Sequence, residues 1–154
     1  MNGFIKLENG ENFSVRWSGY DEIIRIAIKE LSFLDDRDEL AEWLKICVPN
    51  ENEDDRNNVP FYKENGEMIR RFIDVRGFTT VNRRLFWIAI ENGEEKLLRL
   101  GEEYSILNPI VITNLMKMHQ TISDNIEIFE EDEEYIVTNN DVVKKIGPAG
   151  KTNV

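Results

Sequence analysis

The chain has 154 residues, a length that fits one domain better than two. Thirty acidic residues oppose nineteen basic ones, so the formal net charge is −11 at pH 7, and hydrophobic residues make up 41% of the chain. This is the composition of a folded domain with a heavily charged surface. Such a surface repels phosphate backbones and anionic membranes, which argues against direct nucleic-acid binding and against membrane binding.

The segments that carry no charge are also too short to span a membrane, which takes about 20 apolar residues. Residues 1–20 hold no apolar run of the kind a signal peptide needs, so none is expected. The one cysteine, Cys47, cannot form an internal disulfide and fits a reducing compartment. We therefore expect a cytoplasmic protein with one domain over residues 1–146 and a flexible tail over residues 147–154.

The first predicted element is a β-hairpin. Phe4–Leu7 and Phe13–Trp17 flank Asn9-Gly10, and this dipeptide favours a tight turn because both residues tolerate positive φ. Apolar and polar residues alternate along the second strand, which predicts one buried and one exposed face.

A helix is predicted directly after the hairpin. Ser18, with Asp21 three residues later, predicts a capping box at its start. Apolar residues then recur at helical spacing on one stripe: Tyr20, Ile23, Ile24, Ala27, Ile28 and Leu31.

A second helix is predicted from Asp36, with Cys47 on its apolar stripe and Pro49 as its end. Cys47 is expected to pack in the core, because its apolar neighbours do not favour a reactive thiolate. The polar segment 49–60, bounded by two prolines, is predicted to be a loop.

The middle of the chain gives mixed signals. Residues 67–76 fit a helix by their apolar spacing and a strand by their composition, so both assignments stay open. Leu85–Ile90 is short and apolar on both faces, which favours a buried strand. Asn92-Gly93 then predicts a turn into Lys96–Leu100 and a second hairpin.

The last third begins with Asn108-Pro109, a favourable cap and first residue for a third helix that runs to Ile122. Two apolar segments, 126–129 and 135–137, predict a third hairpin around an acidic run, and residues 140–146 predict a helical turn. These elements predict the α+β class, with an antiparallel sheet built from hairpins and about three helices packed on one face.

Few residues indicate catalysis. His119, the only histidine, lies on the apolar stripe of the third helix and is expected to be half-buried and hydrogen-bonded. Gly150-Lys151-Thr152 matches the end of a phosphate-binding loop, but Lys145 stands where its first glycine is needed. With one Cys and one His, a zinc site is not expected. We predict no catalytic residue, no cofactor and no metal.

A basic and aromatic segment over residues 70–87 stands out against the acidic background. One interpretation is a pocket for a phosphate-containing ligand, in a small-molecule receptor or an enzyme. The favoured interpretation is that its arginines neutralise acidic parts of the same chain. The candidate ligand-binding residues are Arg70, Arg71, Arg83 and Arg84.

The charge favours a protein-binding module that captures a basic protein partner, for example an inhibitor of a nucleic-acid-binding protein. Immunity proteins against nuclease toxins and phage anti-defence proteins share this composition, although no family motif is matched. An assembly subunit is a second alternative. The carboxylates expected to contact the partner are Asp35, Asp36, Asp38, Glu39, Glu51, Glu53, Asp54, Asp55, Glu130, Glu131, Asp132, Glu133 and Glu134.

Overall fold

The structure is a computed structural model, and it describes residues 2–34, 39–45, 61–62, 68–69, 71–123, 128–131, 135–138 and 142–144. In chain order its elements are β1 (Asn2–Lys6), β2 (Asn12–Arg16), α1 (Trp17–Leu31), α2 (Glu39–Lys45), β3 (Phe61–Tyr62), β4 (Met68–Ile69), β5 (Phe72–Asp74), the 3-10 turn η2 (Val75–Gly77), α3 (Thr80–Leu100), the 3-10 turn η3 (Gly101–Glu103), α4 (Pro109–Ser123), β6 (Ile128–Glu131), β7 (Tyr135–Thr138) and β8 (Val142–Lys144).

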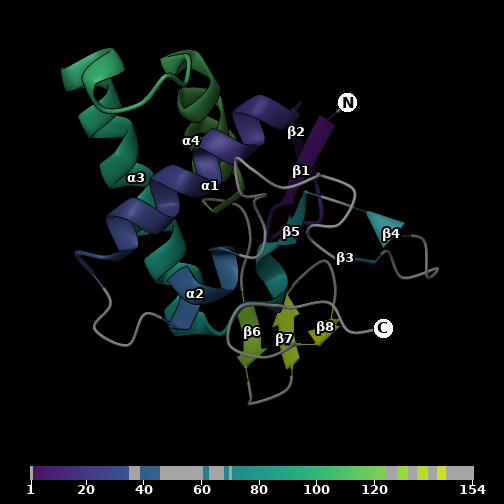
Figure 1. Cartoon of the computed structure of the whole chain (residues 1–154). Helices are drawn as coiled ribbons and strands as arrows, with labels where there is room; N and C mark the ends of the chain where they lie inside the picture. Colours follow the sequence, from purple (N-terminus) through teal and green to yellow (C-terminus); the bar gives the residue numbers. More distant parts are fainter. Residues whose placement is uncertain are drawn as a thin grey trace.

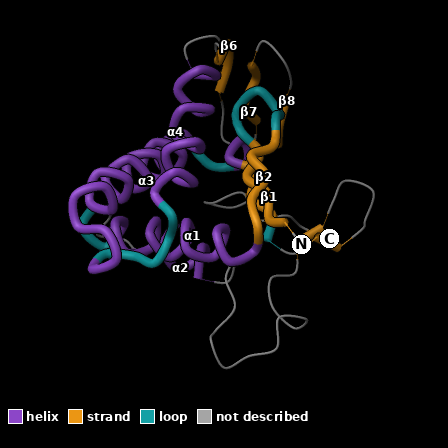
Figure 2. Tube along the Cα trace, turned by 90° about the horizontal axis from the view of Figure 1, so that it is seen from above, coloured by secondary structure: helices purple, strands orange, loops and turns teal. Residues whose placement is uncertain are grey.

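The α+β class is confirmed, but the sheet that carries the core is mixed. Strand β1 lies between β2 and β5, antiparallel to β2 and parallel to β5, with Ile5 opposite both Phe13 and Ile73. The described residues form four α-helices instead of about three, and these lie to one side of β1 and β2 (Figures 1 and 2). The parallel pair arises because α1 and α2 separate the hairpin from β5, and parallel strands need such a crossover.

The first hairpin is confirmed. Gly10 has a positive φ of 86°, and the Leu7 amide donates to the Glu11 carbonyl at 2.8 Å across the turn. The predicted capping box is wrong, because α1 already begins at Trp17 and no side chain caps it. Asp21 is instead buried, and its carboxylate accepts hydrogen bonds from Arg71.

The predicted strand over Leu85–Ile90 and the second hairpin are also wrong, because residues 80–100 form the single helix α3. Thr79 caps it by accepting a hydrogen bond from the Asn82 amide at 3.2 Å. The segment is apolar on more than one side because α3 packs against both α1 and α4, so a wide part of its circumference is buried.

Gly93 marks the close approach of two helices and not a turn. A Cβ atom at this position would lie 2.2 Å from Cγ2 of Ile26 on α1. The absence of a side chain therefore lets α1 and α3 approach each other, and the helix tolerates the glycine because the packing outweighs its low helix propensity.

The remaining predictions have mixed outcomes. In the open segment 67–76, the described residues form the strands β4 and β5 and the first part of the 3-10 turn η2, so the strand assignment holds for β4 and β5 only. The third helix is confirmed as α4, with the Asn108 side chain accepting from the Ile110 amide at 3.2 Å. The third hairpin is confirmed as β6 and β7. The helical turn predicted over residues 140–146 is wrong, because its described part, Val142–Lys144, is strand β8 paired with β7.

For the second helix the described part is α2, whose apolar Leu40, Trp43 and Leu44 are buried. Asp36, Cys47, the loop 49–60 and the tail 147–154 lie outside the described residues.

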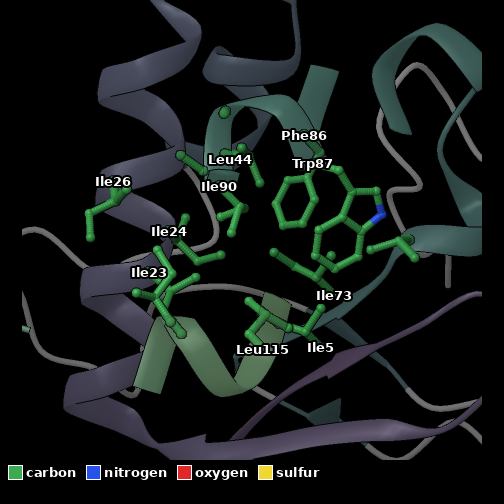
Figure 3. Packing of buried hydrophobic residues seen from close by; sticks show 14 of the residues in the cluster. Ile5, Ile23, Ile24, Ile26, Leu44, Ile73, Phe86, Trp87, Ile90 and Leu115 are labelled. Atoms are coloured by element: carbon green, nitrogen blue, oxygen red, sulfur yellow. The ribbon is translucent and has the colours of Figure 1, made fainter. Parts of the chain in front are cut away.

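The core lies between the mixed sheet and the helices (Figure 3). Ile5 of β1 and Ile73 of β5 meet Ile24 of α1, Ile90 of α3 and Leu115 of α4 in one cluster. A chain of edge-to-face aromatic contacts extends this cluster to α2, and such contacts stabilise beyond the area they bury. The ring centroids are 6.0 Å apart for Trp43 and Phe78, 5.5 Å for Phe78 and Phe86, and 5.2 Å for Phe86 and Trp87.

The contact at Gly93 predicts an unusual response to alanine. Gly93→Ala raises helix propensity, yet its methyl group overlaps Ile26, so we expect a net loss of about 1–2 kcal/mol in the free energy of unfolding. Urea unfolding measures this loss. Asn92→Ala, a change at the neighbouring half-exposed position, is the control and should not destabilise the protein. A Gly93→Ala variant more stable than the wild type would contradict the close approach of α1 and α3.

Candidate functional site

The first candidate site is the basic segment, and its best-defined arginine faces inward. Arg71 is 3% exposed, and its Nε and Nη2 donate to the two carboxylate oxygens of Asp21 at 2.8 and 3.1 Å. Its guanidinium also stacks on Trp17, 4.0 Å from the ring centroid. The Phe4 amide donates to the Arg71 carbonyl, and Arg71 has a φ of 55°. This residue thus joins α1, β1 and the start of β5.

The other arginines of the segment lie in different settings. Arg76 donates to both carboxylate oxygens of Asp74 at 3.0 and 2.8 Å. Arg83 is buried and Arg84 is exposed on α3, whereas Arg70 lies outside the described residues. The contacts of Arg71 and Arg76 therefore support the neutralising interpretation of this segment.

The buried pair between Asp21 and Arg71 should be costly to break. Either Asp21→Asn or Arg71→Met leaves its partner charge buried, so each should lower the free energy of unfolding by about 3–5 kcal/mol. The double variant should cost less than the sum of the two. Chemical unfolding of the three variants measures the coupling. Glu42→Gln, which breaks the exposed ion pair with Lys45, is the control and should cost less than about 1 kcal/mol. If the loss in the double variant equals the sum of the two single losses, the interaction between Asp21 and Arg71 is contradicted.

The second candidate is a buried carboxylate beside the single histidine. Glu8, in the turn after β1, accepts a hydrogen bond from Nε1 of Trp87 on α3 at 2.6 Å. His119 on α4 is half-buried, as its stripe predicts, and its Nε2 lies 3.6 Å from Oε1 of Glu8. The imidazole and indole rings are stacked, with centroids 3.7 Å apart. The turn after β1, helix α3 and helix α4 thus meet at the Glu8 carboxylate.

Two opposing effects act on the pKa of Glu8. Burial raises it, whereas the contact with His119, its own backbone amide and the Trp87 hydrogen bond lower it, and the net pKa lies below the ordinary value of 4.5. Because the folded state binds this proton more weakly than the unfolded chain, the ionised carboxylate stabilises the fold above about pH 4.5. That stabilisation is lost as the pH falls through the folded-state pKa.

Glu8→Gln should therefore be less stable than the wild type at neutral pH, with a difference that shrinks on acidification below about pH 4.5. Urea midpoints between pH 7 and pH 3 measure it. His119→Gln is a matched variant that keeps Glu8 but removes the neighbouring imidazole, and it should weaken the same pH dependence. A stability difference for Glu8→Gln that stays constant over this range would show that the charge of Glu8 has no part in the fold.

A third buried carboxylate is also neutralised. Glu30 of α1 is 1% exposed and accepts hydrogen bonds from Nζ of Lys96 at 2.8 Å and from the Tyr104 hydroxyl at 2.6 Å. Burial, together with the hydrogen bond to Glu30, raises the pKa of Tyr104 above its usual range. This cluster fastens α1 to α3 and to the residue that follows η3.

The acidic residues expected to contact a partner are only partly described. Glu39 is exposed at the start of α2, and Glu130 and Glu131 belong to strand β6. The structure therefore does not test whether the predicted carboxylates gather on one surface. The others lie outside the described residues: Asp35, Asp36, Asp38, Glu51, Glu53, Asp54, Asp55, Asp132, Glu133 and Glu134.

A different group of carboxylates stands out on the structure. We name it the α3 acidic face, and it lies on the second half of α3 and on η3. No cation of the described residues lies within ion-pair distance of it, since Lys96 pairs with Glu30 and Arg99 forms no ion pair. Figure 1 places the end of α3 at the outer edge of the helices, away from β1. Its members are Glu91, Glu94, Glu95, Glu102 and Glu103.

Sequence reasoning missed this surface because it assigned residues 85–100 to a hairpin. In the predicted hairpin Glu91 and Glu95 lie on either side of the Asn92-Gly93 turn, between the two strands. In a helix they are four residues apart and share one side. The usable signal was the length of the segment, because 21 residues without proline suit a helix better than two short strands.

Within the described parts of the chain, no helix is long and apolar enough to cross a membrane. No three His, Cys, Asp or Glu side chains come together there in a way that could hold a metal ion. Comparison with family models, with curated proteins and with solved structures gave no match for this chain.

Proposed function

We propose that the chain is a protein-binding module that captures a basic partner, of the kind that inhibits a nucleic-acid-binding protein by presenting carboxylates in place of phosphates. The observation that carries the proposal is the α3 acidic face. Its carboxylates are exposed or half-exposed and form no ion pair with any described residue. Complementary charge of this kind accelerates association and selects the partner.

The distribution of ion pairs supports this proposal. Three carboxylates that are buried or half-buried each pair with a cation: Asp21 with Arg71, Asp74 with Arg76 and Glu30 with Lys96. The fold thus neutralises its interior charges and leaves those of α3 without a partner. Acidic residues that follow the end of a helix oppose the helix dipole, so Glu102 and Glu103 do not stabilise α3.

The phosphate-ligand alternative has less support. It needs arginines that converge on a ligand, and Arg71 already binds Asp21 in the interior. No contact of the described residues favours an assembly subunit.

The experiment is capture from a native lysate, followed by association kinetics with the protein obtained. The wild-type chain should retain a basic protein at low salt, and added DNA should compete for that protein. Glu91→Lys combined with Glu95→Lys should slow association by about tenfold or more, and the effect should fall as salt screens it.

The matched control combines Glu11→Lys with Glu42→Lys, which changes the net charge by the same amount at two exposed carboxylates outside the α3 acidic face and outside the predicted contact residues. It should leave the association rate within about twofold of the wild type. An equal loss in both variants would assign the effect to net charge and not to α3. Retention of the same proteins by wild type and by the α3 variant would refute the proposal.

A further inference from the structure

The mixed sheet ends in strand β2, which pairs with β1 on one side and with no described strand on the other. Unpaired N–H and C=O groups at strand spacing form a template on which another strand can pair. Proteins commonly protect such an edge with proline, lysine or a bulge, and β2 carries neither residue and pairs with β1 without a bulge. Its side chains at Asn12, Ser14 and Arg16 are exposed.

The register of the hairpin decides which backbone groups face outward. The Leu7 amide donates to the Glu11 carbonyl at 2.8 Å, so this pair is hydrogen-bonded across the hairpin. Bonded and non-bonded pairs alternate along an antiparallel ladder. Phe13 is therefore bonded to β1, whereas the N–H and C=O groups of Asn12 and Ser14 point away from it. Nothing in the part of the chain that the structure describes bonds these outward groups.

The two charges at this edge lie at opposite ends of the strand. Glu11 precedes β2 and Arg16 ends it, and both are exposed without an ion pair to any described residue. They are about 16 Å apart, because each strand residue rises about 3.3 Å, so they do not pair with each other. Lys6 of β1 lies one strand further in, where Asp74 of β5 is opposite it. The edge is thus negative at one end and positive at the other.

A second copy of β2 fits this arrangement of charges. When the two strands run antiparallel with Ser14 opposite its counterpart, Asn12 of each copy lies opposite Arg16 of the other. The Glu11 end of each copy then lies beside the Arg16 end of the other, and no like charges are directly opposed. A lysine-rich strand would instead bring its own positive charges toward Arg16.

We infer that β2 is the contact through which two copies of this chain associate, with the three-stranded sheets joined into one across a two-fold axis. Such a contact uses the same surface of both copies, as two-fold dimers do. The inference goes beyond the proposed function and does not depend on it. Because each copy has a net charge of −11, association should strengthen as salt is added, whereas capture of a basic partner should weaken.

The decisive variant is Ser14→Pro, which removes the outward N–H and leaves the bonds to β1, since proline is tolerated at the outer edge of a sheet. Ser14→Ala is the matched control. Both variants lose the hydroxyl that accepts from Nδ2 of Asn2 at 3.0 Å, but only proline lacks the N–H. Sedimentation in about 0.3 M salt, where the net charge is screened, measures association. Ser14→Pro should associate about tenfold more weakly than wild type or Ser14→Ala, because two hydrogen bonds are lost per dimer.

Amide hydrogen exchange on the wild-type chain tests the same contact and decides the matter if Ser14→Pro does not fold. The Asn12 and Ser14 amides should exchange more slowly as the chain concentration is raised, whereas the Phe13 amide, already bonded to β1, should not change. A wild type that stays monomeric at about 0.5 mM, where even a small interface associates, would overturn the inference. Association that leaves Ser14 unprotected, or that a folded Ser14→Pro variant retains in full, would also overturn it.

Discussion

The contact between α1 and α3 is the constraint on which the exposed surface depends. The two helices approach each other at Gly93, where a side chain would overlap Ile26. Lys96, one turn further along α3, then reaches Glu30, and Tyr104 binds the same carboxylate. This contact fixes the rotation of α3 about its own axis. Because one side of α3 faces α1, the opposite side, with Glu91, is left in solvent.

Charge pairing inside the fold explains how an acidic chain forms a compact core. A buried carboxylate is costly unless a cation and hydrogen bonds compensate it. Arg71 compensates Asp21, and Lys96 compensates Glu30. Glu8 has the Trp87 hydrogen bond and the nearby His119. These residues link segments far apart in sequence, so they also specify which elements pack together. The cations they use are not available to neutralise the surface.

The predicted acidic segments and the α3 acidic face rest on different observations. The predicted acidic segments depend on composition alone, and the structure describes only Glu39 and the backbone of Glu130 and Glu131 among them. The α3 acidic face depends on helical geometry, on the absence of ion pairs and on exposed apolar side chains. Leu98, on the same half of α3, is also exposed.

The sequence by itself determined the elements whose signals are local. The Asn9-Gly10 turn, the apolar stripe of α1 and the Asn108-Pro109 start of α4 all follow from the preferences of neighbouring residues. Only the tertiary structure decided the rest. Gly93 has the local signature of a turn, and only the approach of Ile26 explains it as a helix contact. Asp21 has the local signature of a cap, yet Arg71, 50 residues away, binds it. The parallel pairing of β1 with β5 likewise depends on a crossover through α1 and α2, which no local pattern encodes. The physical reason is the same in each case, because the deciding interaction joins residues that are distant in the chain.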